Sequence, residues 1–227
     1  ACGQTVLPDR SVLIGQKLVE NTKIQKFKCD ILSNFQKMCQ NKSDKSLFVL
    51  YFAAHEITHA FDEVGIMYNS KGQYQPLYDN ETIRAFHNAS DCIRTQYSNF
   101  SIHGVNVDGN VTLGENIADH GGLKIAEIAY ENWLQLNGNS DATLPALEAF
   151  SPFQLFYLGY ALPWCAIHTE SMLKNHVMRD EHAPDNFRVR GPLSNSPRFA
   201  QTWGCPLNSA MNPEKKCQIW GQQNILP

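Results

Sequence analysis

Two histidines and a glutamate occur in the pattern H-E-x-x-H at residues 55 to 59. On an α-helix, residues four apart lie about 40° apart around the axis and about 6 Å apart along it, so His55 and His59 share a face. Two imidazole nitrogens on one face can hold one metal ion, and Glu56 is offset enough to reach a water bound to that metal. The pattern predicts a zinc site with a carboxylate base, which is an arrangement that hydrolyses peptide bonds.

A second motif favours the metal over the alternative that both histidines are ordinary hydrogen-bonded core residues. In the segment GENIAD, residues 114–119, Glu115 is placed to give a third ligand from a separate helix. Asp119, one turn on, would accept a hydrogen bond from the non-ligating nitrogen of one ligand histidine, and Asp62 would serve the other. A solvated acidic face is the alternative here, but residues 117–125 are largely apolar, and an unpaired carboxylate is costly to bury.

Apolar periodicity indicates the elements that must position these groups. One buried helix is expected over residues 47–63, and the helix of Glu115 is expected over about 113–136. We further expect, in chain order, an amphipathic helix near 10–27, a loop or short hairpin over 65–80, a helix over 81–98, a turn-rich stretch over 104–114 and a core helix without chemistry over 151–178. The fold class predicted is mainly α, with little β structure.

Four segments in this order resemble the C-terminal catalytic half of the neprilysin/endothelin-converting-enzyme family of zinc metalloendopeptidases. The resemblance runs from about Phe48 to Trp220, and the segments that carry it are HEITHAFD, GENIADHGGLK, HAPDNFRVRG at 182–191 and MNPEKKCQIW at 211–220. It implies a zincin-like helical catalytic domain that binds one zinc ion per chain.

The same resemblance implies a role for each matching residue. His55, His59 and Glu115 would be the zinc ligands, and Glu56 would be the catalytic base. His182 would stabilise the oxyanion and Arg188 would contact the substrate backbone. Asp62 and Asp119 would hold the ligand histidines.

The N-terminal part of the chain departs from the family. Only fifteen residues separate Cys39 from His55, where the family has several hundred, and the family's N-A-aromatic-aromatic motif is not found upstream of the zinc helix. We therefore divide the chain into an N-terminal segment, 1–46, and a zinc metallopeptidase catalytic domain, 47–227. The N-terminal segment is interpreted as a remnant of the start of the family's ectodomain, with unrelated sequence as the alternative.

Three functions fit this sequence. The first is a zinc-dependent endopeptidase that cuts extracellular peptides on the amino side of bulky apolar residues, as the resemblance implies. The second is a truncated, catalytically inactive secreted relative that binds zinc or peptides, and the intact Glu56 argues against it. The third is an incomplete stretch of a longer protease. A peptide substrate is the partner expected, and the sequence assigns no oligomeric state.

Composition excludes some other classes. The 227 residues carry a net charge of −3, and no basic cluster exists beyond Lys215-Lys216, which argues against a nucleic-acid or anionic-membrane partner. Apolar residues make up 43% of the chain, yet no run of 18 occurs, so we expect no transmembrane segment.

Seven cysteines and five N-glycosylation sequons favour an extracellular protein, either secreted or the ectodomain of a membrane-anchored form. The resemblance pairs Cys92 with Cys217, Cys29 with Cys205 and Cys39 with Cys165, and it leaves Cys2 over. The candidate glycosylation sites are Asn41, Asn80, Asn88, Asn99 and Asn110. Four of them lie between residues 80 and 112, which predicts an exposed flap there.

Overall fold

The computed structural model describes residues 45–76, 78–138 and 147–220, and this part of the chain is mainly helical, as predicted. Its one named sheet is a two-stranded antiparallel hairpin. The elements in chain order are α3 (Lys45–Thr58), η1 (His59–Phe61), η2 (Gly65–Met67), α4 (Asn80–Ser98), β1 (Ser101–Ile102), β2 (Val105–Asn106), α5 (Leu113–Leu136), α6 (Pro152–Ala161), η3 (Leu162–Trp164), α7 (Glu170–Arg179), α8 (Asp185–Asn195) and α9 (Pro197–Trp203). None of the described helices is long and apolar enough to cross a membrane.

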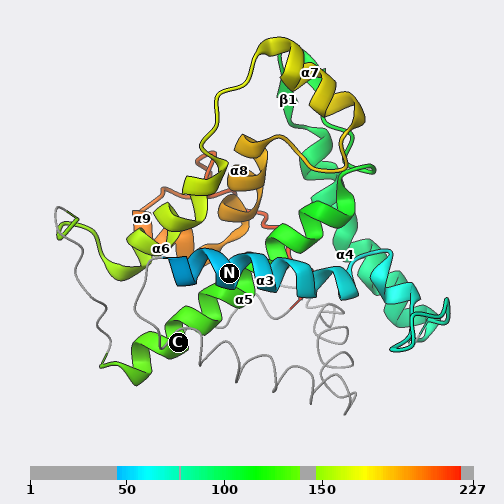
Figure 1. The fold of residues 1–227 in the computed structure, drawn as a ribbon, viewed down its shortest axis with the longest axis horizontal. Helices are drawn as coiled ribbons and strands as arrows, with labels where there is room; N and C mark the ends of the chain where they lie inside the picture. The colour runs from blue at the N-terminus through cyan, green and yellow to red at the C-terminus, as the bar shows by residue number, and fades with distance from the viewer. Residues whose placement is uncertain (1–44, 77, 139–146, 221–227) are drawn as a thin grey trace, which may run out of the picture.

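Helices α3 and α5 form the central pair of the molecule and pass against each other along much of their length (Figure 1). Two glycines of α5 permit the close approach. A Cβ added at Gly121 would lie 2.5 Å from Cγ2 of Thr58, and one added at Gly122 would lie 3.0 Å from the backbone nitrogen of His55. Because α5 has no side chain at these positions, the backbone that carries His55 lies directly against the first half of α5.

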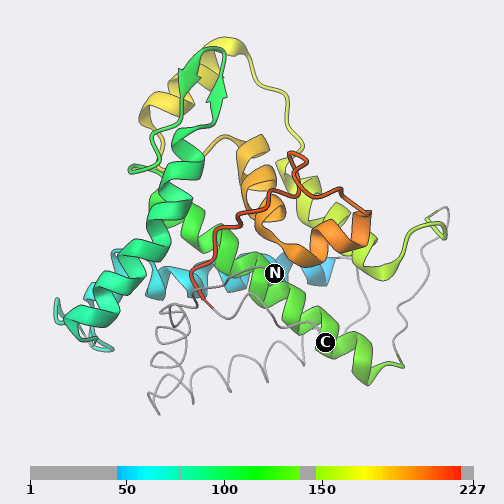
Figure 2. The same cartoon turned by 180° about the vertical axis from the view of Figure 1, so that it is seen from behind.

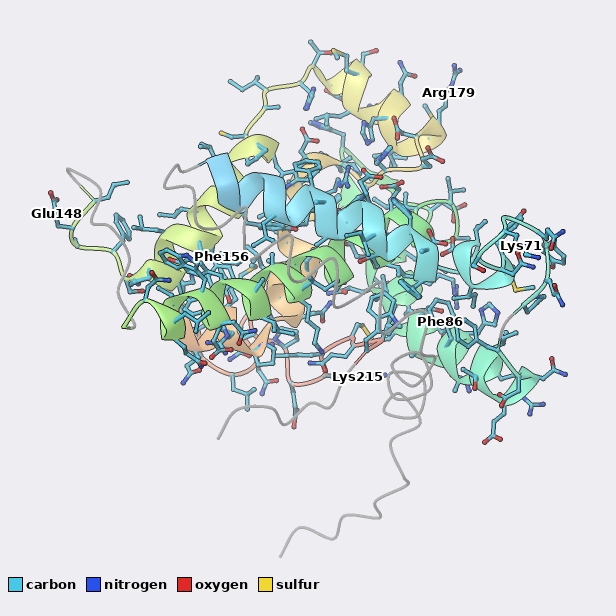
Figure 3. The ribbon with its side chains drawn as sticks, turned by 60° about the horizontal axis from the view of Figure 1, so that its bottom comes forward. Lys71, Phe86, Glu148, Phe156, Arg179 and Lys215 are labelled. Atoms are coloured by element: carbon cyan, nitrogen blue, oxygen red, sulfur yellow. A yellow bond between two sulfur atoms is a disulfide. The ribbon has the colours of Figure 1, made fainter. Side chains whose placement is uncertain are left out.

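Two apolar clusters flank this pair (Figure 3). The first lies around α4 and the start of α5 and includes Phe86, which is 1% exposed. The second lies between α3, the later part of α5, and α6, and it includes Phe156, which is 3% exposed. The functional side chains are carried by elements that both clusters fix in place.

The Cys92–Cys217 disulfide is formed as predicted and ties α4 to the C-terminal segment. That segment runs past the rear of α5 (Figure 2). Cys165 and Cys205 are free thiols among the described residues. Their implied partners Cys39 and Cys29, like Cys2, lie outside the described residues, so those two pairings stay predictions. The helix expected near 10–27 and the sequon at Asn41 also lie outside them.

The prediction of one core helix over 151–178 is wrong. Helix α6 is closed at its start by a capping box between Ser151 and Gln154, and it ends at Ala161. Pro163 follows within the short η3 turn, where the proline ring and its missing N–H prevent an α-helix from continuing. A separate helix, α7, starts at Glu170.

Two other expectations are corrected in detail. The helix predicted over 47–63 ends as an α-helix at Thr58, so His59 lies in the 3-10 turn η1. The segment predicted as an exposed flap is largely the packed helix α4, which buries Phe86, Ile93 and Tyr97. Its sequon asparagines, together with the one that follows β2, are nevertheless exposed: Asn80, Asn88, Asn99 and Asn110.

Candidate metal centre

The three predicted zinc ligands meet where α3 and η1 face the first turn of α5. His55 Nε2 lies 3.2 Å from His59 Nε2 and 3.2 Å from Glu115 Oε2. His59 Nε2 lies 3.4 Å from Glu115 Oε1. Although η1 breaks the α-helical pattern after Thr58, the imidazole of His59 still lies on the same side as that of His55.

These spacings fit a tetrahedral zinc ion. Bonds of 2.0–2.1 Å at tetrahedral angles place neighbouring ligand atoms about 3.3 Å apart. Glu115 Oε2 is buried and makes no hydrogen bond, although nitrogen atoms of His55, His182 and Arg188 lie 3.2–3.6 Å from it. A cation among these atoms would satisfy this oxygen. Two imidazoles and one carboxylate are also the donor set that zinc takes in hydrolytic sites. The residues present therefore fit the metal that the sequence predicts.

Asp119 lies behind this cluster, fully buried on α5 one turn after Glu115. Its Oδ1 lies 2.9 Å from Nδ1 of His55, which is the nitrogen directed away from the cluster. The hydroxyl of Tyr51 donates to the same oxygen at 2.5 Å. The guanidinium of Arg188 donates through Nε and Nη2, at 2.8 and 2.7 Å. One carboxylate thus fixes both a ligand histidine and an arginine.

Asp62 holds the second histidine in the same manner. Its Oδ2 accepts a hydrogen bond from His59 Nδ1 at 2.8 Å. Its other oxygen accepts from the backbone N–H groups of Val64 and Gly65, at 2.9 and 2.7 Å. Asp62 is itself fixed by the turn that follows η1, so the ring of His59 is oriented through Nδ1 and directs Nε2 to the cluster.

Electrostatics of the cluster favour a bound cation. Burial by itself lowers the pKa of His55, but the adjacent carboxylates of Asp119 and Glu115 outweigh it and raise that pKa to about 9. Burial by itself raises the pKa of Asp119, but the hydrogen bonds from Arg188 and His55 outweigh it and lower that pKa to about 2. A zinc ion would take the place of the His55 proton, because an imidazole nitrogen binds a metal only when it is deprotonated.

His182 and Arg188 reach the same cluster from the loop before α8 and from α8. His182 Nε2 lies 3.2 Å from Glu115 Oε2, and its Nδ1 donates to Asp180 Oδ1 at 2.8 Å. Arg188 Nη2 lies 3.6 Å from Glu115 Oε2, and its guanidinium carbon lies 4.2 Å from the ring centre of Trp164. The structure therefore brings together both residues with the zinc-ligand candidates.

Glu56 follows His55 on α3, and its side chain is exposed to solvent. A groove of about 410 Å³ elsewhere on the molecule contains none of these residues. It is lined by the side of α5 that bears Lys124 and Glu127 and by the C-terminal segment up to Trp220. The candidate metal ligands and their hydrogen-bond partners lie at the α3–α5 cluster instead.

Three residues of the site were missed by sequence reasoning. Tyr51, which binds Asp119, lies one helical turn before His55, so an i, i+4 search upstream of the motif would have found it. Asp180 lies two residues before His182, which is a spacing typical of short side-chain turns. Trp164, whose ring covers Arg188, carries no such signal because it is 24 residues distant in sequence.

Comparison with known proteins agrees with the geometry. The model of Peptidase family M13 matches residues 50–219. Endothelin-converting enzyme 1 of Mus musculus is 46% identical over 73% of the chain, and Neprilysin-1 of Caenorhabditis elegans is 39% identical over 73%. Among solved structures, the Mycobacterium tuberculosis zinc metalloprotease Zmp1 in complex with an inhibitor matches 75% of the chain with a TM-score of 0.67 at 26% identity.

The chain spans only a fraction of these proteins: 21% of the mouse enzyme, 22% of the nematode one and 27% of the mycobacterial chain. The family match nevertheless covers most of this chain, and it includes all of α5 and the part of α3 that carries His55. By that match, and by the relatives that share it, the chain belongs to peptidase family M13.

Proposed function

We propose that this chain is the catalytic part of a zinc-dependent endopeptidase. The observation that carries the proposal is the meeting of three ligand side chains. His55 Nε2 lies 3.2 Å from His59 Nε2 and 3.2 Å from Glu115 Oε2, and His59 Nε2 lies 3.4 Å from the other carboxylate oxygen, Oε1. Two imidazoles and one carboxylate are the protein ligands of hydrolytic zinc sites, which keep a further position for water or substrate. One ion per chain is expected.

Zinc held by these three residues would supply Lewis-acid activation of a water molecule and of the substrate carbonyl. Glu56 would act as the general base, because its carboxylate follows the ligand His55 on α3 and faces solvent. It would take a proton from the attacking water and pass it to the leaving amine as the peptide bond breaks. Asp119 and Asp62 would keep each histidine in the orientation that directs Nε2 inward.

His182 and Arg188 would act on the substrate. His182 is held through Nδ1 by Asp180, so a proton on Nε2 is directed at the space beside Glu115 and can stabilise the oxyanion. Nε and Nη2 of Arg188 both donate to Asp119. We assign Nη1 of Arg188 to a carbonyl of the substrate backbone, with Trp164 fixing the plane of the guanidinium.

Peptides are the proposed substrates, cut on the amino side of bulky apolar residues in an extracellular setting. The exposed sequon asparagines of α4 and the neighbouring turns are compatible with glycosylation in that setting. Names of relatives such as endothelin-converting enzyme agree with peptide processing. The preference for apolar residues comes from the family resemblance alone.

Cleavage of a quenched fluorescent peptide by the purified chain tests this function, with the zinc content measured in parallel. The Glu56→Gln variant is expected to keep about one zinc per chain and to lose at least a hundredfold in kcat, since general bases contribute about 10²- to 10⁴-fold. Glu170→Gln is the matched control. Glu170 is an exposed carboxylate on α7 that pairs with Lys174, so both zinc content and cleavage should stay unchanged.

Mass spectrometry of the products then locates the cut. A new amino terminus at a Leu, Ile, Phe or Val residue would agree with the proposed preference. Full zinc content without cleavage by the unmodified chain would contradict the endopeptidase and leave a zinc-binding relative. Cleavage that persists in Glu56→Gln would contradict the role of the base.

A further inference from the structure

A second group of possible metal ligands lies beside the first. Glu115, Glu181 and His182 each offer one ligand atom, and these atoms all lie within 4.8 Å of one another. The distance from His182 Nε2 to Glu115 Oε2, at 3.2 Å, equals the spacing found within the first group. Glu115 belongs to both groups, and its Oε2 is the oxygen that lies 3.2 Å from both His55 Nε2 and His182 Nε2, so its carboxylate would serve both ions.

The hydrogen bonds of His182 show which nitrogen would bind the ion. Its Nδ1 lies 2.8 Å from Asp180 Oδ1, and this nitrogen is the donor because a carboxylate only accepts. The backbone N–H of His182 donates to the same oxygen at 2.9 Å, which fixes the loop. A neutral His182 then presents the lone pair of Nε2 to Glu115 Oε2. Two electron pairs at this distance repel each other, and either a proton on Nε2 or a cation between the two atoms removes the repulsion.

Exposure and charge in this region favour a cation. Glu181 is exposed and the side chain of His182 is 38% exposed, so an ion has a path from solvent. Negative charge is also in excess. One zinc ion and Arg188 would together carry three positive charges, whereas five carboxylates lie within ion-pair or ligand distance of the histidines: Asp62, Glu115, Asp119, Asp180 and Glu181.

We propose that a second divalent cation, zinc when it is in excess, binds between Glu115, Glu181 and His182. That this ion binds is inferred from these three residues and does not depend on the proposed function. Its consequence rests on the proposed function: the ion takes the nitrogen that would otherwise donate to the oxyanion, so it inhibits peptide cleavage. Cleavage should therefore rise as the first zinc site fills and fall again at higher free zinc concentrations.

Binding is measured by equilibrium dialysis of the purified chain against metal-buffered zinc, with bound zinc counted by elemental analysis. The unmodified chain should reach about two zinc ions per chain, with a weaker second step. Glu181→Gln should keep the first step and weaken the second by tenfold or more, because it removes a ligand without altering the first group. Glu170→Gln, an exposed carboxylate of α7, is the matched control and should keep both steps.

Cleavage assays over the same zinc series complete the test. The free zinc concentration that halves the activity should rise at least tenfold in Glu181→Gln, while activity with one bound zinc stays unchanged. Saturation of the unmodified chain at one zinc, or an unaltered second step in Glu181→Gln, would overturn this inference and leave the proposed function intact. Absence of the first step would instead contradict the proposed function.

Discussion

At Asp119, one fully buried carboxylate accepts hydrogen bonds from Tyr51 and Arg188 and lies 2.9 Å from Nδ1 of His55. His55 and Arg188 have different tasks in the proposed reaction, because His55 would bind zinc and Arg188 would hold the substrate, while Tyr51 donates a hydrogen bond to the carboxylate. A carboxylate can serve all three because its two oxygens accept several hydrogen bonds at once. Buried networks of this kind depend on every member being satisfied.

Replacement of Asp119 by asparagine tests this dependence. The side-chain amide keeps the shape of the carboxylate but removes its charge and turns one acceptor into a donor. Zinc affinity is expected to fall 10- to 100-fold, as for other partners of metal-ligating histidines. The free energy of unfolding should fall by about 3–5 kcal/mol, because the buried guanidinium of Arg188 loses its counter-charge. Chelator competition and urea unfolding measure the two effects.

Tyr51→Phe is the control for that variant. It removes one hydrogen bond to Asp119 and leaves the charge in place, so the loss of stability should be about 1 kcal/mol and zinc affinity should change little. If Asp119→Asn bound zinc as tightly as the unmodified chain, the carboxylate would not be what orients His55.

Residue identities at the site were largely predictable, because the i, i+4 rule connects Glu115 to Asp119 within α5 and His55 to His59 across the junction of α3 and η1. The pairing of Asp119 with Arg188 was not predictable in this way. These residues are 69 positions apart, and only the packing of α8 against α5 brings them together. Local periodicity carries no information about such long-range contacts.

At the scale of secondary-structure elements, the packing of α3 across α5 determines the geometry of the site. Two of the described helices, α4 and α5, match the predicted ranges because apolar positions recur at helical spacing. The break between α6 and α7 escaped prediction because the apolar run continues through Pro163. The close approach of α3 to α5 depends on Gly121 and Gly122, and this role is visible only once α3 is seen to pack against them.

Gly121→Ala is expected to destabilise the fold. Its new methyl group would lie 2.5 Å from Thr58 Cγ2 and 2.8 Å from the ring of Trp220, so helix α3 or the C-terminal segment must move. Overpacking of this kind costs about 1–3 kcal/mol, which exceeds the gain of up to about 1 kcal/mol that alanine brings to a helix. Denaturant unfolding midpoints measure the difference.

Gly159→Ala is the matched control, because Gly159 lies within α6 and a Cβ there meets no atom within 4 Å. Helix propensity then acts without a clash, and the variant should gain about 0.5–1 kcal/mol. Gly121→Ala should therefore lower the free energy of unfolding, and Gly159→Ala should raise it. Stabilisation by both substitutions would show that α3 and α5 do not pack as closely as described.

At the scale of the whole molecule, the disulfide between Cys92 and Cys217 joins parts of the chain that are 125 residues apart. The loop that it closes contains α5, α6, α7, α8 and α9, and so all the functional residues except Asp62 and those of α3 and η1. Sequence alone could not choose this pair among seven cysteines, because every pairing of cysteines is open until the fold is known. The family resemblance supplied the choice.

Replacing Cys92 and Cys217 together by serine should lower the free energy of unfolding by about 5 kcal/mol, the value that the chain-entropy model gives for a loop of this length. Cys165→Ser and Cys205→Ser are the comparison, because nothing among the described residues pairs with either thiol. A change of less than about 1 kcal/mol in both would show that these thiols are free in the whole protein. A loss of several kcal/mol in either, which the implied bonds to Cys39 and Cys29 predict, would show that those bonds form. Peptide mapping of the unreduced protein separates the two results, because a Cys92–Cys217 fragment appears in both and a fragment linking residues 1–44 to Cys165 or Cys205 appears only in the second.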